Sequence, residues 1–196
     1  MNKIVTYLIL IIVCFGCKVN LKSETFDESI LRAIHTERNI SLDGFMKGIS
    51  NSSYIILPAV PIGLFANYLY CDCEDKLYNS INVGSAIIIS GGLSLLIKEI
   101  IQRPRPFDKL DFVDNILNES GYSRPSMHVA TAFSLATSLT LIEPKWYVIV
   151  PSYIWAAAVA YSRIHLGVHY FSDVIVGAIV GVGVSFATSA IMKSMK

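Results

Sequence analysis

The sequence predicts an all-α protein, a multi-span helical membrane bundle, and three observations support this. Hydrophobic residues make up 53% of the 196 residues and charged residues only 16%, and the mean hydropathy is +0.53. A soluble domain of this size leaves much of its surface in water and contains about 25% charged residues. The apolar residues also gather in runs close to the ~20 residues that a helix needs to cross a bilayer. Lipid is therefore the expected solvent of most of this chain.

The N-terminal segment, residues 1–18, has the layout of a secretory signal. Lys3 precedes an almost wholly apolar stretch, residues 4–15, and Gly16-Cys17 follows it. A short basic start, an apolar stretch and a small residue are typical of signal peptides. Cleavage, lipoprotein-like processing at Cys17 and retention as a signal anchor all remain open. Each of them places the residues after Lys18 on the far side of the membrane.

Residues 19–53 are expected to form amphipathic helices on the membrane surface. This stretch is polar and charged, but its apolar residues recur at helical spacing, which is typical of helices that lie on a bilayer or cover the mouth of a bundle. Thr25 and Glu28 have capping-box spacing and predict one helix start. His35 lies among charged residues and is expected to be solvated.

Residues 54–196 are expected to form a membrane core of five helices. The last predicted helix carries Gly177, Gly181 and Gly183, a small-residue face suited to close helix packing. The five helices follow from five apolar runs, at residues 54–70, 81–101, 129–142, 146–161 and 174–192.

Cysteine spacing and net charge exclude two classes of function. The four cysteines, Cys14, Cys17, Cys71 and Cys73, have no histidine or cysteine partners at zinc-site spacing. We expect free thiols, because a Cys-x-Cys pair seldom forms a relaxed disulfide. The net charge of +1 gives no basic surface for nucleic acid.

Counting spans from the N-terminal segment assigns the loops to two sides. Residues 102–127 and 162–170 fall on the outer side, and the turn at residues 71–79 falls in the cytoplasm, where free thiols persist. The outer loops contain more Lys and Arg than the inner ones, against the positive-inside rule. Either the topology is inverted or the outer cations have a role.

Three cations near the outer helix ends predict an oxyanion site. Arg105 and Arg163 offer planar forks that match phosphate oxygens, and Lys98 adds a point charge. Ser126 can add a hydroxyl donor, and the helix start after Pro125 can add backbone N–H groups. One cation at a helix end is usually an interfacial anchor. The prediction therefore depends on all three meeting on one membrane face.

Two histidines and an aspartate accompany these cations. His169 and Asp173 are four residues apart, so on a helix they share one face. The carboxylate can then accept from one ring nitrogen and leave the other as a nucleophile, although such a pair alone is more often structural. His128 can protonate a leaving oxygen. The remaining polar residues of these loops are assigned no role: His165 as a satisfied polar residue, and Arg103, Arg124 and Lys109 as loop charges.

Together these clusters resemble the tripartite motif of the type 2 phosphatidic acid phosphatases, a family that includes lipid A phosphatases and vanadium haloperoxidases. The motif consists of Lys-x6-Arg-Pro, Pro-Ser-Gly-His and Ser-Arg-x5-His-x3-Asp. Only the glycine differs, because Met127 stands in its place, which affects the expected pocket shape and substrate choice. The matching positions are Lys98, Arg105 and Pro106, then Pro125, Ser126 and His128, then Ser162, Arg163, His169 and Asp173.

The resemblance implies a reaction through a phosphohistidine. It implies that His169 attacks phosphorus and that Asp173 orients the His169 ring. It also implies that His128 first donates a proton to the leaving oxygen and then accepts a proton from water. It implies that the non-bridging oxygens are held by Lys98, Arg105, Ser126 and Arg163. No metal or other cofactor is expected.

The expected function is hydrolysis of a lipid phosphomonoester or diphosphate by an integral protein of the cytoplasmic (inner) membrane, with its site facing the periplasm or exterior. The resemblance offers undecaprenyl diphosphate, phosphatidylglycerol phosphate, phosphatidic acid and lipid A as substrates. Two alternatives remain, a lipid phosphotransferase and a non-catalytic lipid- or anion-binding membrane protein. A haloperoxidase fits the apolar composition less well.

Overall fold

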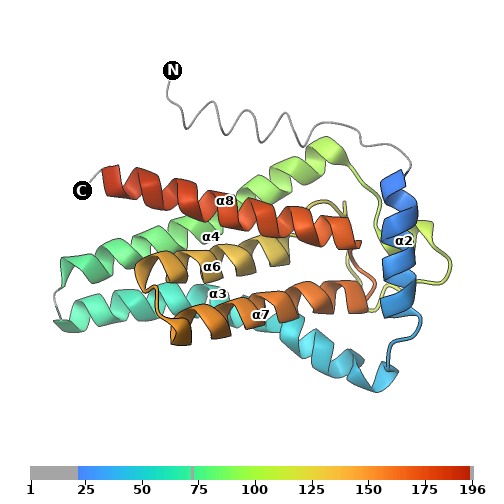
Figure 1. Ribbon diagram of the computed structural model, residues 1–196, viewed down its shortest axis with the longest axis horizontal. Helices are drawn as coiled ribbons and strands as arrows, with labels where there is room; N and C mark the ends of the chain where they lie inside the picture. The colour runs from blue at the N-terminus through green and yellow to red at the C-terminus, as the bar shows by residue number, and fades with distance from the viewer. Residues whose placement is uncertain (1–21, 72, 195–196) are drawn as a thin grey trace.

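The computed structural model describes residues 22–71 and 73–194, so the expected signal segment, residues 1–18, lies outside the described residues. All regular secondary structure in the described ranges is helical. Five long helices of the described ranges lie side by side (Figure 1). They are α3 (Asp43–Cys71), α4 (Glu74–Ile101), α6 (Met127–Ile142), α7 (Trp146–His165) and α8 (Phe171–Ser194).

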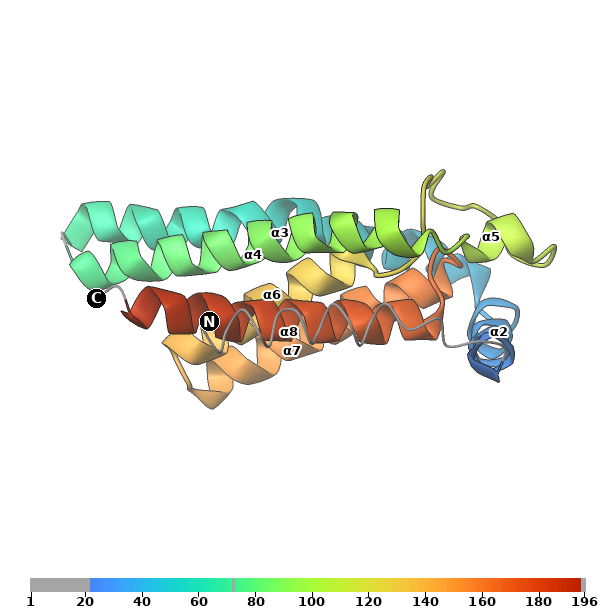
Figure 2. The ribbon, with the colours of Figure 1, turned by 90° about the horizontal axis from the view of Figure 1, so that it is seen from above.

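Three shorter elements complete the described chain: α2 (Lys22–His35), the 3-10 helix η1 (Ile40–Leu42) and α5 (Pro106–Lys109). Figure 2 shows α2 and α5 at the same end of the bundle, with α2 lying across the bundle axis. Because α2 begins at Lys22, the helix start predicted at Thr25 is wrong.

Helix α2 is held to the bundle by its buried face, which changes the assignment of His35. Leu31 and His35 are fully buried, and His35 Nδ1 lies 2.8 Å from the carbonyl oxygen of His165 at the end of α7. The expectation of a solvated His35 is therefore wrong. The sequence shows the charges around this residue but not the helix end that covers it.

Helix α3 is one continuous helix with Pro58 and Pro61 inside it. It joins residues 43–53, expected as part of the surface region, to the first apolar run. The carbonyl oxygen of Pro61 accepts a hydrogen bond from Ser80 of α4 at 2.9 Å. The second amphipathic stretch is therefore the first part of a long helix of the bundle.

Within residues 22–71 and 73–194, three helical segments are long and apolar enough to cross a membrane: Ile40–Cys71, Glu74–Lys109 and Phe171–Ser194. Helix α6 is apolar but shorter. Large apolar side chains point outward from the bundle, as Ile55 (72% exposed) and Ile88 (75% exposed) do. Such a surface suits a lipid environment and does not suit water.

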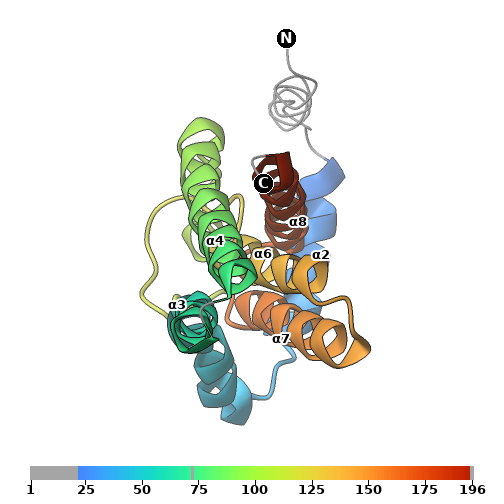
Figure 3. The same ribbon diagram turned by 90° about the vertical axis from the view of Figure 1, so that its left-hand side faces the viewer.

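Helix α6 occupies the centre of the bundle and packs against α4, α7 and α8 (Figure 3). Helix α8 approaches it closely at two glycines. A Cβ atom at Gly177 would lie 2.6 Å from the carbonyl oxygen of Ser126, and one at Gly181 would overlap that of Ala130. The predicted small-residue face is confirmed at these two positions but not at Gly183, which faces open space.

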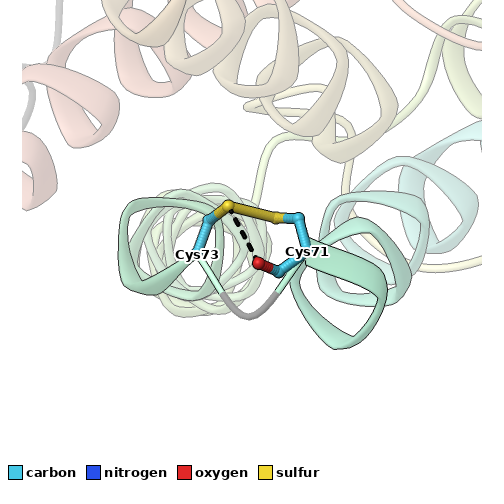
Figure 4. Close-up of a disulfide and its surroundings, with 2 residues drawn as sticks. All are labelled: Cys71 and Cys73. Carbon is cyan, nitrogen blue, oxygen red and sulfur yellow. Dashed lines mark hydrogen bonds between the residues drawn. A yellow bond between two sulfur atoms is a disulfide. The ribbon is translucent and has the colours of Figure 1, made fainter.

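The turn between α3 and α4 contains a disulfide between Cys71 and Cys73 (Figure 4), whose Cα atoms are 5.3 Å apart. This separation is within the range that a disulfide spans. The expectation of free thiols at these positions is therefore wrong. The two cysteines consequently give no support to a reducing compartment at this end of the bundle.

Candidate active site

The structure brings the predicted site residues to one end of the bundle, where α4 and α7 end and α6 and α8 begin (Figures 1 and 2). All seven side chains are buried, from fully covered to 9% exposed. They are Lys98, Arg105, Ser126, His128, Arg163, His169 and Asp173.

Local chain reversals set these positions. Gln102 adopts left-handed backbone angles (φ 51°) and ends α4 just after Lys98. Arg105 is the N-cap of α5, and Pro106 occupies the first position of that helix. After α7, Gly167 (φ +70°) turns the chain toward α8. A Cβ atom there would lie 2.6 Å from Val113, so only glycine fits this reversal.

Arg105 and Arg163 converge on one carboxylate, that of Glu119 in the loop between α5 and α6. Arg105 Nη2 lies 3.0 Å from Glu119 Oε2, and Arg163 Nη2 binds Oε1. Two arginines from separate helical elements thus bind a single anion. This is the arrangement that an oxyanion site requires, and no sequence motif pointed to Glu119 as its occupant.

The electrostatics of Glu119 reflect this position. Burial raises its pKa, but the charge of Arg163 and its hydrogen bond, followed by the charges of Arg105 and His128, lower the pKa to about 2. The carboxylate is therefore ionised across the physiological pH range.

Two donors in the cluster have no hydrogen-bond partner among the described residues. They are the hydroxyl of Ser126 and the Nε–H of Arg163, both buried. Arg163 is otherwise fixed by Ser50, which accepts from Nη1 at 2.6 Å. Unsatisfied buried donors are costly, so these two groups indicate a site for a further acceptor.

His169 lies in the loop before α8, not on it, because α8 begins at Phe171. The expected shared helix face is therefore wrong, although the two groups still meet. His169 Nδ1 lies 3.8 Å from Asp173 Oδ2 and 3.4 Å from the hydroxyl of Ser123, which itself donates to Asp173 Oδ2. Ser123 therefore links histidine and aspartate. Asp173 Oδ2 also accepts from the backbone N–H of Tyr170 at 3.1 Å, a capping contact at the start of α8.

The imidazole of His169 is neutral at physiological pH. Burial lowers its pKa to about 3, against the raising effect of Asp173, and the charges of Arg163, Lys98 and Arg105 lower it further. A neutral ring nitrogen is the form that can act as a nucleophile.

Arg103 and Arg124, expected to be loop charges, bind the other oxygen of Asp173. Arg103 Nη1 lies 2.7 Å and Arg124 Nε 3.0 Å from Asp173 Oδ1. Arg103 Nη2 reaches Asp27 of α2 at 2.8 Å, and Asp27 accepts from the Ser172 backbone N–H at 2.9 Å. The interpretation of these arginines as loop charges is wrong, because α2 covers them and supplies a second carboxylate.

Two other histidines at this end of the bundle, His128 and His165, contact residues of α3. His128 is in the first turn of α6, and its ring meets Tyr54 of α3 edge to face with centroids 5.4 Å apart. His165 Nε2 lies 2.9 Å from Asp43 Oδ1, which confirms it as a partnered polar residue outside the cluster.

Met127 stands where the resemblance calls for glycine, and the backbone there does not demand glycine. It is the first residue of α6, and its φ is not positive. The helix start can therefore present its N–H groups to an anion with methionine at this position.

The described residues contain no group of three or more His, Cys, Asp or Glu side chains that could hold a metal ion. The polar residues that sequence reasoning missed are Asp27, Glu119 and Ser123. The one available signal was position, since Glu119 and Ser123 lie six and two positions before the second motif, which begins at Pro125.

Comparisons with known proteins agree with this geometry. The PAP2 superfamily matches residues 79–195. The lipid A 4'-phosphatase of Bacteroides thetaiotaomicron is 34% identical over 39% of this chain and 34% of its own length, so the chain spans about a third of that relative. The undecaprenyl-diphosphatase of Sulfolobus acidocaldarius is 27% identical over 82% of this chain and 76% of its own length. The phosphatidylglycerophosphatase B of Bacillus subtilis is 28% identical over 88% and 86%.

Solved structures show the same fold. The transmembrane PAP2-type phosphatidylglycerolphosphate phosphatase from Bacillus subtilis superposes with a TM-score of 0.75, at 26% identity, over 100% of this chain and 98% of that one. LpxE from Aquifex aeolicus gives 0.70 at 27% identity, over 83% and 93%.

Proposed function

The chain belongs to the PAP2 superfamily, and from this premise we propose that it is a membrane phosphatase that hydrolyses a phosphomonoester or diphosphate of a lipid. The observation that carries the proposal is the convergence of Arg105 and Arg163 on one carboxylate beside the neutral His169. The apolar helices bring this anion site to one end of a bundle suited to lipid. A lipid headgroup can reach such a position while its chains remain in the bilayer.

We assign the nucleophile to Nε2 of His169. Ser123 and Asp173 lie on the Nδ1 side of the ring, so the proton belongs on Nδ1 and the lone pair on Nε2. Attack forms the N–P bond as the bond from phosphorus to the lipid oxygen breaks. His128 donates a proton to that oxygen. His128 then takes a proton from water as water attacks the phosphohistidine, which releases inorganic phosphate and restores His169.

The non-bridging oxygens are assigned to Lys98, Arg105, Arg163 and Ser126. The two donors without partners, Ser126 Oγ and Arg163 Nε, are available for this purpose. Charge builds on these oxygens in the transition state, where preorganised donors stabilise it most. We propose that the cations suffice and that no metal is required.

The relatives' names define the substrate panel. They cover a lipid A phosphate, undecaprenyl diphosphate and phosphatidylglycerophosphate, and phosphatidic acid completes the set. Their common feature is a terminal phosphate on a membrane-anchored alcohol or phosphate.

We further propose that the protein lies in the cytoplasmic membrane with the site on its outer face. The signal-like segment, residues 1–18, supports this orientation. The excess of cations at the site end is accounted for, because Arg103, Arg105 and Arg163 bind carboxylates there. The Cys71–Cys73 disulfide at the opposite end argues for the reverse orientation, so sidedness requires a direct measurement.

The function is tested with detergent-solubilised protein and the four lipid phosphates, with and without a chelator. We expect inorganic phosphate from at least one lipid, with no effect of the chelator and no release by His169→Ala. Rapid quenching with substrate labelled in its terminal phosphate should give an acid-labile label on the protein. Transfer of the label to a second lipid would establish a phosphotransferase, and binding of the lipids without turnover would contradict enzymatic function.

A further inference from the structure

We propose that Glu119 is an internal competitor for the phosphate site, which a substrate phosphate must displace and which selects for phosphate groups of charge −2. This rests on the proposed function and goes beyond it, because it assigns specificity to a residue outside the three motifs. Glu119 bridges the two arginines that are assigned to the phosphate.

The contacts of Glu119 resemble those of a bound oxyanion. Its two oxygens are divided between two guanidinium groups, with Oε2 3.0 Å from Arg105 Nη2 and Oε1 on Arg163. Its side chain is 23% exposed, so it enters the cluster from the surface. The lowered pKa of Glu119 agrees with its permanent negative charge.

The residues after Glu119 occupy further donors of the cluster. Lys98 Nζ donates to the carbonyl oxygen of Tyr122 at 2.6 Å. Arg105 donates from Nε to Gly121 at 3.0 Å and from Nη2 to Ser120 at 3.1 Å. All three cations are thus bound by residues 119–122. A phosphate that takes these donors must displace this segment.

The segment is joined to the rest of its loop by local contacts that can persist when it moves. The side chain of Asn115 accepts from the Glu119 backbone N–H and donates to its carbonyl oxygen, both at 2.9 Å. Asn118 and Gly121 have positive φ values of 50° and 75°, and Ser120 and Gly121 are exposed. No residue of a hydrophobic core cluster lies between Asn115 and Tyr122.

The charge of a ligand determines whether it can displace Glu119 from the two arginines. A phosphomonoester dianion replaces the single charge of Glu119 with two, and it has oxygens for the unpartnered Ser126 Oγ and Arg163 Nε. A phosphodiester carries one charge and gains no Coulombic advantage over the carboxylate. Glu119 therefore favours terminal phosphates over the diester phosphates of the surrounding lipids.

The test uses Glu119→Gln, which keeps the size of the side chain and removes its charge, with Asp111→Asn as the matched control on the same loop. Asp111 is exposed, and its substitution by asparagine removes the same charge as Glu119→Gln. Binding of inorganic phosphate and of dimethyl phosphate is measured by calorimetry in detergent. The wild type and both variants are also measured in a second series in which each carries His169→Ala. Binding in that series does not depend on turnover.

For Glu119→Gln we expect phosphate to bind about tenfold more tightly, because the fraction of open sites rises, and dimethyl phosphate to become a detectable ligand. Asp111→Asn should bind as the wild type does. Unchanged or weaker phosphate binding in Glu119→Gln would overturn the proposal and make Glu119 a structural clamp for the arginines.

A measurement on the wild type covers the case in which Glu119→Gln does not fold. Hydroxyl-radical labelling of Tyr122, a half-buried side chain of the segment, should increase when inorganic phosphate binds, since the segment is displaced, and unchanged or weaker labelling would overturn the proposal. These results are separate from the proposed function: an active wild type without the Glu119 effect overturns this inference alone. Phosphate binding that Glu119→Gln tightens, without any lipid phosphatase activity, overturns the proposed function alone.

Discussion

Arg103 Nη1 lies 2.7 Å from Asp173 Oδ1, and this pair joins the end of α4 to the first turn of α8. Asp173 is fully buried and receives a second guanidinium from Arg124. The carboxylate is thus fixed on one side by two arginines and on the other by Ser123 and the Tyr170 backbone N–H. The position of the His169 ring depends on this set of contacts.

Arg103→Ala should therefore lower kcat by about 10–100-fold, since small misplacements of reacting groups cost this much, and leave KM nearly unchanged. Arg103→Lys should restore part of the loss. Steady-state kinetics on the preferred lipid measure both. The control is Lys109→Ala, an exposed cation of α5, which should be mild. A mild effect of Arg103→Ala would mean that Arg124 alone positions Asp173.

His169→Ala should abolish turnover, by at least about 10³-fold, while the protein stays folded, because no other group is placed to form the N–P bond. Asp173→Asn should retain more activity, since it only orients and stabilises the ring. Single-turnover kinetics and thermal unfolding measure the two properties. Substantial residual turnover in His169→Ala would remove this residue as the nucleophile.

Arg105→Lys and Arg163→Lys should not rescue the loss seen in the alanine variants, and each should reduce kcat/KM by about 10²-fold. An ammonium group cannot reproduce two parallel N–H contacts to one anion. Arg38→Lys is the matched control, because Arg38 pairs with Asp43 away from the cluster. Equal losses in all three variants would indicate a general effect of arginine replacement on folding and would remove the special role of Arg105 and Arg163.

The lowered pKa of His169 predicts a pH dependence of stability. The unfolded chain binds a proton on this residue near its ordinary pKa of 6.5, but the folded protein does so only near 3. The neutral ring therefore makes its full contribution to the free energy of unfolding above pH 6.5. This contribution is lost as the pH falls from 6.5 toward 3. Between pH 7 and 5 the Tm of the wild type should fall more steeply than that of His169→Gln. Parallel Tm curves would show that the ring titrates normally.

Sidedness is measured by cysteine labelling in intact spheroplasts, in a chain whose four native cysteines are replaced by serine. A cysteine at Asp111, exposed at the site end, should react with an impermeant thiol reagent. One at Lys145, exposed between α6 and α7, should react only after lysis. Tyr170 is 2% exposed and is unsuitable as a probe. The reverse labelling pattern would place the substrate in the cytoplasmic leaflet.

The sequence predicts the five core helices and the end of the bundle where the cations meet. Long apolar runs have no stable alternative in lipid, because every backbone polar group must be satisfied within a helix. The motif spacing then fixes which helix ends carry Lys98, Arg105 and Arg163. Even the close approach at Gly177 and Gly181 can be predicted from residue size.

Only the tertiary structure decides what these side chains bind. The contact between Asp27 and Ser172 joins residues 145 positions apart, and Glu119 reaches Arg163 across 44 positions. Asp27, Glu119 and His35 look like ordinary surface residues in the sequence. Their roles depend on which helix end or loop covers them. Helical periodicity and apolar length determine the bundle because they act locally along the chain, whereas the burial and pairing of each charge depend on distant segments and are fixed only when the helices pack.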